Sequence, residues 1–345
     1  MHGVVSPKRV PMAAQHPQLD MEAPDSQPDD ALTVFRLLET AWQEGLACAL
    51  ITVVDIIGGS ARGKGAHMAV LADGRYCGYV SGGCVEATIA AEAVVALENG
   101  ADRVLRIGQD SPLVDVRLPC GGGMDLHIHV NPDPQIVRAS IEAMEFRESF
   151  RISIRTDTAT LAFDQTLTAT DETGWSHGVF ERVYRPRTRL VLVGRGLEVE
   201  TTARIGIASG LEVIAYCADG DSADAVHRSG ATAHWMATPA VRPDFAIDLY
   251  TAVIFLFHDH DWEIGLIEHV LRNHHPFFIG ALGSRRTHQM RADALRSNGV
   301  PESLIELIHG PVGLFGPTRN AASLALSILG QVTQVREQAQ TLAPV

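Results

Sequence analysis

Residues 189–200 read RLVLVGRGLEVE, an apolar run followed by a glycine turn and the start of a helical pattern. The rest of the C-terminal half repeats this order, with strands predicted at EVIAYC, TAVIFLF and PFFIG and with helical segments between them. Strands that alternate with helices in this way form a parallel sheet covered by helices on both faces. We therefore predict an α/β protein whose residues 186–338 form a Rossmann-like, doubly wound domain.

The N-terminal half predicts a different, mixed α/β domain over residues 30–135. An amphipathic helix is followed by a strand at CALITVVDII and by a hairpin at HMAVLA and YCGYV. A helix that ends at Gly100 and strands at DRVLRIG and MDLHIHV complete the pattern. Residues 1–29 have no apolar period and are expected to be a flexible tail, and residues 136–185 are expected to be a connecting β-rich segment.

Composition and charge argue against several classes of function. The chain has 345 residues and a formal net charge of −13, which repels the phosphate backbone of nucleic acid. No apolar run approaches the roughly 20 residues that a membrane helix needs, and the first residues lack the apolar stretch of a signal peptide. The five cysteines include no CxxC pair, which argues against a disulfide framework. We expect a cytoplasmic protein with no nucleic-acid or membrane partner.

Two glycine loops with a cysteine are the strongest chemical candidates, SGGCVE at residues 81–86 and LPCGGG at residues 118–123. Glycines allow successive backbone N–H groups to face one concavity, and a thiolate beside them could contact a metal or carry sulfur. The candidate residues are the thiols of Cys84 and Cys120 and the loop residues Ser81, Gly82, Gly83, Gly121 and Gly122. A tight turn with a buried, inert thiol is the alternative for Cys84, and it explains the three glycines after Cys120 less well.

Positively charged and histidine side chains lie near these loops in the sequence. Arg62 and Lys64, in GGSARGKG, could supply positive charge to the same end of the sheet, or they could be solvated loop residues. His127 and His129 share one face of a strand, a spacing that can bind a metal. Because no third ligand is evident near them in the sequence, we interpret this face as polar and exposed to solvent.

The Rossmann-like half contains two further candidate sites. Gly194 and Gly196 match the first two positions of the dinucleotide-binding pattern G-x-G-x-x-G, but Val199 stands at the third small position, where it would crowd the helix against its strand. In IGALGSRRTH, phosphate could be held by Gly283, Ser284, Arg285 and Arg286. A helix cap at Ser284 followed by two exposed arginines is the alternative reading of that second segment.

Five motifs, in order along the chain, resemble those of XdhC/CoxI proteins: GGSARGKGAHMAV, GYVSGGCVEATI, LPCGGGMDLHI, FFIGALGSRRTH and IHGPVGL. The resemblance spans about residues 30 to 335. It implies an N-terminal XdhC-type domain that handles a cofactor and a C-terminal Rossmann-like domain. It also implies a protein that binds the molybdenum cofactor (molybdopterin) while a cysteine desulfurase supplies sulfur, and that delivers it to xanthine dehydrogenase or a related molybdenum hydroxylase.

Carried over to the matching positions, the resemblance places the contact to molybdenum or sulfur on Cys120 or Cys84. It implies a chaperone and maturation factor more than a turnover enzyme, and a homodimer is compatible with it. Two alternatives remain open from the residues themselves. One is an NAD(P)-dependent oxidoreductase that uses the glycine turn at Gly194, and the other is a scaffold that binds protein partners and no cofactor.

Overall fold

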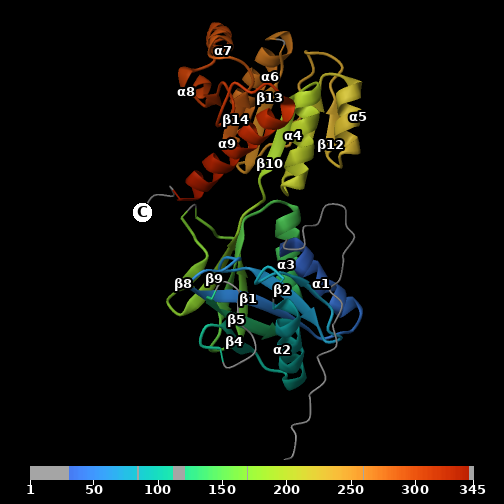
Figure 1. Ribbon diagram of the computed structural model, residues 1–345, viewed down its shortest axis with the longest axis vertical. Coiled ribbons are helices and arrows are strands. Elements are labelled where there is room, and N and C mark those ends of the chain that lie inside the picture. Colours follow the sequence, from blue (N-terminus) through green and yellow to red (C-terminus); the bar gives the residue numbers. More distant parts are fainter. Residues whose placement is uncertain (1–30, 84, 112–120, 169, 259, 342–345) are drawn as a thin grey trace, which may run out of the picture. The chain divides into compact units, whose positions relative to one another are not determined.

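The computed structural model describes residues 31–341, except 84, 112–120, 169 and 259 (Figure 1). The chain divides into two compact units between Arg185 and Pro186. Within the described residues, no helix has both the length and the apolar character needed to cross a membrane. The first unit is mixed α/β and the second is built on a parallel sheet, as the sequence predicts.

A five-stranded antiparallel sheet with the order β3-β2-β1-β5-β4 forms the centre of the first unit. Its middle strand, β1 (Cys48–Ile57), pairs with β2 (His67–Leu71) and β5 (Gly123–Val130). The outer strands are β3 (Tyr76–Gly78) and β4 (Arg103–Gly108). Successive side chains of a strand point to opposite faces, and apolar residues of β1 enter the cores on both faces of this sheet.

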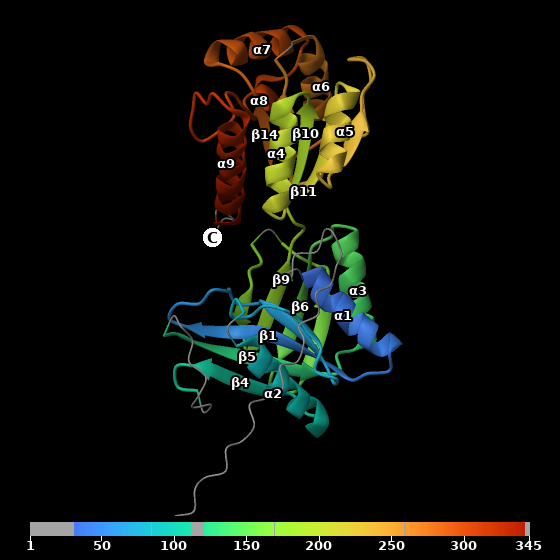
Figure 2. The same cartoon turned by 45° about the vertical axis from the view of Figure 1, so that its right-hand side comes forward.

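Helices and a second sheet cover the two faces of this central sheet. Helix α2 (Glu86–Asn99) packs on one face and ends at Gly100, whose φ of 63° is the left-handed conformation that glycine favours. Figure 2 shows α1 (Ala31–Gln43) and α3 (Pro134–Glu145) side by side on the opposite face. They share that core with a four-stranded antiparallel sheet, β7-β6-β9-β8, whose strands are Phe150–Arg155 (β6), Thr160–Asp164 (β7), Gly174–Ser176 (β8) and Val179–Tyr184 (β9).

Residues 134–184 therefore contribute to the hydrophobic core of the first unit. Ile141 of α3 and Phe150 and Phe180 of the second sheet are buried in one cluster with Phe35 of α1. The segment that the sequence suggested as a connection thus folds as a structural layer in its own right.

The second unit has six parallel strands in the order β12-β11-β10-β13-β14-β15. Numbered along the unit, this is the order 3-2-1-4-5-6 of dinucleotide-binding folds. The strands are Arg189–Gly194 (β10), Glu212–Cys217 (β11), Thr232–Trp235 (β12), Thr251–Leu256 (β13), Phe278–Ala281 (β14) and Ile308–His309 (β15). One face is covered by Leu197–Ala208 (α4), Gly220–Arg228 (α5) and Ala321–Thr341 (α9), and the other by His260–Asn273 (α6), Arg285–Ser297 (α7) and Glu302–Ile305 (α8).

A buried ion pair fastens α7 to α6 in this second unit. The side chains of Arg291 and Glu263 are each 1% exposed, and Nη2 of Arg291 lies 2.9 Å from Oε1 of Glu263. The same nitrogen donates to the carbonyl oxygen of Leu282 at 2.7 Å. Arg291 therefore links α7 both to its neighbouring helix and to the turn that follows β14.

We expect Glu263→Gln to lower the free energy of unfolding of the second unit by about 3 to 5 kcal/mol, because it leaves the buried guanidinium of Arg291 without its counter-charge. Asp293→Asn is the control, since Asp293 pairs with Arg296 at the surface, where such pairs contribute about 1 kcal/mol or less. Calorimetric unfolding of the full chain measures both. Equal effects of the two substitutions would contradict a stabilising role for the buried pair.

Candidate functional site

Two glycine segments lie at one end of the central sheet of the first unit. Residues 58–66 follow β1, and residues 109–122 join β4 to β5. The strand register pairs Ile57 with Gly123, so β1 ends where β5 begins. Both segments consequently leave the sheet at the same edge.

The third segment, described at residues 79–83 and 85, follows β3 and reaches the same end. Gly78, the last residue of β3, pairs with Met68 near the start of β2, which is where residues 58–66 rejoin the sheet. A Cβ atom built on Gly82 would lie 3.5 Å from Cβ of Ala61. We call this end of the sheet, with the described residues 58–66, 79–83, 85, 109–111, 121 and 122, the glycine edge.

Gly122 makes the closest backbone contact at the glycine edge. A Cβ atom at this position would lie 2.4 Å from the carbonyl oxygen of Gly59 and 2.7 Å from that of Ile57, which only glycine avoids. The carbonyl oxygen of Gly122 accepts a hydrogen bond from the N–H of Gln109 at 3.0 Å. The segment before β5 is thereby pressed against the segment after β1.

The structure therefore brings Gly82 and Gly122, from the two predicted cysteine loops, onto the common segment 58–66. Gly82, Gly83 and Gly121 have φ angles of 88°, 104° and 69°, in the left-handed region that glycine readily adopts, and all three are exposed. The two candidate thiols, Cys84 and Cys120, lie outside the described residues.

Glu86 was not identified from the sequence, yet it organises the loop that contains Gly82. Its side chain, in a residue that is 2% exposed, accepts hydrogen bonds from the N–H groups of Val80, Ser81 and Val85 and from the hydroxyl of Ser81. Burial raises the pKa of Glu86, but hydrogen bonds from the N–H and hydroxyl of Ser81 and from the backbone of Gly83 and Glu86 outweigh burial and hold that pKa below its usual range. The hydroxyl of Ser81, a candidate ligand contact, is engaged in shaping the loop.

Arg182 is a second residue that the sequence reading missed. It alternates along β9 with the buried Phe180 and Tyr184, so its side chain enters the layer between the two sheets. A Cβ atom on Gly65 would lie 2.3 Å from Cδ of Arg182, so the arginine packs against the segment 58–66. Within the described residues, Arg182 forms no ion pair. Burial of its guanidinium lowers the pKa of Arg182, and the nearby positive charge of Arg62 lowers that pKa further.

The two positive residues predicted from GGSARGKG have different surroundings. Nζ of Lys64 lies 2.7 Å from Oδ1 of Asp55, and this contact lowers the pKa of Asp55. Arg62 is half-buried and close enough to Arg182 for their charges to interact. The segment 58–66 therefore carries Arg62 and contacts Arg182, while the charge of Lys64 is paired with Asp55.

The glycine turn of the second unit is explained largely by packing. A Cβ atom on Gly194 would lie 2.4 Å from the carbonyl oxygen of Leu256, and the N–H of Gly196 donates to Oγ of Ser222 at 2.8 Å. Glu198 stands in the first turn of α4, and Val199 lies on the buried face of the same helix with no exposed surface. The N–H of Gly196 already donates to Ser222, and the carboxylate of Glu198 lies at the helix start. Both features oppose the binding of a pyrophosphate at Gly194 and Gly196.

The segment after β14 caps helix α7 at Ser284, which was the alternative interpretation of IGALGSRRTH. Oγ of Ser284 accepts the N–H of Thr287 at 3.1 Å, and Gly283 has a φ of 136°. Arg285 and Arg286 are exposed in the first turn of α7. Ser284 thus has a structural role, while the two arginines are accessible.

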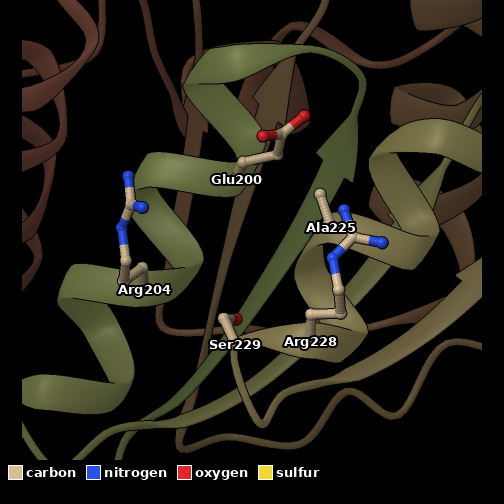
Figure 3. A pocket seen from close by; sticks show the side chains of 5 residues that line it. All are labelled: Glu200, Arg204, Ala225, Arg228 and Ser229. Carbon is tan, nitrogen blue, oxygen red and sulfur yellow. The ribbon is translucent and has the colours of Figure 1, made fainter.

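A groove lies between α4 and α5, with one arginine on each of these helices (Figure 3). Its lining residues are Glu200, Arg204, Ala225, Arg228 and Ser229. None of them belongs to the glycine turn at Gly194 and Gly196, so this groove does not extend the dinucleotide pattern.

The interpretation of His127 and His129 as a solvent-facing pair is wrong. They are 1% and 8% exposed, because the face of β5 that carries them is covered within the first unit. Asp102, 27 residues before His129 in the chain, supplies the neighbour that the sequence did not reveal, with Oδ2 at 2.5 Å from Nδ1 of His129.

We expect Glu86→Gln to lower the free energy of unfolding of the first unit at neutral pH by about 1.5 to 3 kcal/mol, since an amide cannot accept all the hydrogen bonds that the carboxylate accepts. Because the folded pKa is depressed, this contribution is present above the ordinary value of 4.5 and disappears as the pH falls through the lowered pKa. Denaturant unfolding at a series of pH values measures it. The exposed Glu98→Gln, on the same helix, is the control, and a pH-independent difference from the wild type would contradict this assignment.

Comparisons with known proteins agree with the fold and with the predicted motifs. The pattern of the XdhC Rossmann domain matches residues 190–332, and that of the XdhC and CoxI family matches residues 41–108. The chain is 38% identical over 308 residues to the molybdenum cofactor insertion chaperone PaoD of Escherichia coli, covering 89% of each protein. The crystal structure of a xanthine dehydrogenase from Bacillus halodurans covers 90% of this chain and 98% of its own with a TM-score of 0.68 at 20% identity, which shows a shared fold. The chain therefore belongs to the XdhC/CoxI family.

Proposed function

We propose that this protein binds the molybdenum cofactor at the glycine edge of its first unit and delivers it to a molybdenum hydroxylase of the xanthine dehydrogenase type. The observation that carries the proposal is the meeting of three glycine segments, described at residues 58–66, 79–83 and 121–122, at one end of one sheet. The relationship to a molybdenum cofactor insertion chaperone supports the choice of ligand.

The chemistry of the glycine edge suits the anionic phosphate of a pterin cofactor. Exposed glycines at positions 82, 83 and 121 leave backbone N–H groups free of side-chain cover. Arg62 follows Ala61, which lies against Gly82, and Arg182 packs on Gly65 of the same segment 58–66, so both place positive charge on that segment. A local cationic site of this kind can bind an anion although the whole chain is acidic.

The proposal assigns the contact with molybdenum or with the incoming sulfur to Cys120 or Cys84. Each is covalently adjacent to a glycine of the glycine edge, Gly121 or Gly83, and neither is among the described residues. A thiolate is the protonation state that binds a soft metal centre. The chain would hold the cofactor while a cysteine desulfurase supplies sulfur, and a hydroxylase that binds the cofactor more tightly would then receive it.

Binding of molybdenum cofactor by the purified full chain tests this function. We expect Gly122→Ala to weaken binding at least about tenfold, because its methyl group would force the segment 57–59 away and separate the loops. Gly220→Ala is the matched control, since a Cβ atom there meets nothing within 4 Å and the position lies in the second unit. Equal binding by both variants would contradict the proposed site.

The thiols are tested in the same assay by Cys84→Ala and Cys120→Ala beside Cys217→Ala, whose thiol is buried in the core of the second unit. At least one of the first two is expected to lose cofactor binding or sulfuration while the third keeps both. Full binding and sulfuration in both variants would overturn the assignment of the thiols and leave the glycine edge to be judged by Gly122→Ala.

An NAD(P)-dependent oxidoreductase is the competing function, favoured by the strand order of the second unit. Because Glu198 stands at the start of α4 and the N–H of Gly196 is used by Ser222, we expect no saturable binding when the protein is titrated with NADH and nicotinamide fluorescence is followed. Saturable micromolar binding that Glu198→Gln strengthens and Gly196→Val abolishes would favour the oxidoreductase instead.

A further inference from the structure

Three side chains with metal-binding atoms converge in the first unit, away from the glycine edge. His127 and His129 lie on one face of β5, and Asp102 immediately precedes β4. The register pairs Arg103 with Ile128, which places Asp102 beside His129. One ligand atom from each of the three residues lies within 4.8 Å of the others.

Oδ2 of Asp102 is the point at which the two imidazoles meet. It lies 2.5 Å from Nδ1 of His129 and 3.4 Å from Nε2 of His127. The other carboxylate oxygen accepts the N–H of Val130 at 2.9 Å. This hydrogen bond fixes the carboxylate so that Oδ2 faces both rings, which is how outer contacts usually orient the ligands of a metal.

His127 is the observation that a simple polar cluster does not explain. It is 1% exposed, and within the described residues neither of its ring nitrogens makes a hydrogen bond. An unsatisfied buried polar group costs about 1 to 3 kcal/mol, so such groups usually have a partner. Oδ2 of Asp102 contacts His129 closely at 2.5 Å, whereas Nε2 of His127 approaches the same oxygen only to 3.4 Å and, among the described residues, forms no well-aligned hydrogen bond.

We propose that Asp102, His127 and His129 bind a divalent transition metal ion, with Zn²⁺ as the expected ion. Two imidazoles and one carboxylate form a three-residue ligand set that suits zinc and neighbouring transition metals, whereas Ca²⁺ and Mg²⁺ prefer oxygen ligands alone. Nε2 of His127 becomes a ligand, and the short contact between Asp102 and His129 is replaced by two bonds to the same ion. A water molecule completes the tetrahedral coordination.

This site is distinct from the glycine edge. β5 begins at Gly123, next to Gly122, and at about 3.3 Å per residue His127 and His129 lie roughly 13 to 20 Å from Gly123 along the strand. Strand β1 separates His127 from the end of the segment 58–66, because Thr52 pairs with His127 on one side and with His67 on the other. The ion would join the outer strand β4 to β5 through Asp102, so its expected effect is on the stability of the sheet. Binding of the molybdenum cofactor and binding of this ion can therefore be measured independently.

Titration of the chelator-treated full chain with Co²⁺, a spectroscopic substitute for Zn²⁺, tests the proposal. We expect the protein to bind one equivalent of Co²⁺ tightly. The visible d–d absorption should have the intensity of a four-coordinate ion, and the near-ultraviolet bands that thiolate ligands produce should be absent. X-ray absorption of the zinc-loaded wild type should show nitrogen and oxygen neighbours that include two imidazoles. Failure to retain metal, or a coordination sphere that contains sulfur in place of the imidazoles, would overturn the proposal.

Substitutions at the ligands locate the ion. We expect His127→Gln and Asp102→Asn to weaken Co²⁺ binding at least about 100-fold, and the rise in Tm that zinc gives the wild type should vanish with it. The exposed His275→Gln, in the second unit, is the matched control and should bind as the wild type does. Unchanged affinity in both ligand variants would refute the site, and if neither variant folds, the X-ray absorption of the wild type decides.

Discussion

The close approach of Gly122 to the backbone of residues 57–59 is the constraint on which the candidate site depends. No side chain fits between these two segments, because a single methyl group would already lie 2.4 Å from a carbonyl oxygen. Gly122 is held against the segment after β1, and Gly82 lies against Ala61. The described glycines of these loops therefore lie together at one end of one sheet. Glu86 then fixes the third loop by accepting hydrogen bonds from its backbone, which leaves the exposed glycines as the accessible part.

Much of this arrangement could be predicted from local sequence patterns. The strand CALITVVDII has the predicted bounds of β1, and Gly100 ends α2 as a left-handed cap, because β-branched runs and a terminal glycine act over a few residues. The repeated strand and helix order of the C-terminal half likewise predicted a parallel sheet. Five motifs in a fixed order indicated the family, and the family relationship is shown by the comparisons.

Contacts between distant residues could not be predicted in this way. Alternation along β5 marked His127 and His129 as polar, yet it could not reveal that the covering layer comes from residues 134–184 or that Asp102 lies beside them. The inward-facing Arg182 was missed for the same reason, since its neighbour Gly65 is more than a hundred residues away in sequence. Ser284 proved to be a helix cap, because the pattern of a phosphate loop and that of a capped helix start share the same residues.

Hydrogen–deuterium exchange of the full chain, with and without molybdenum cofactor, tests the central claim most directly because it reports on every loop at once. The account predicts that the cofactor slows exchange in peptides covering residues 58–66, 79–86 and 109–123 together, since one ligand contacts all three. Protection confined to peptides of the second unit, around residues 194–200 or 283–287, would contradict it.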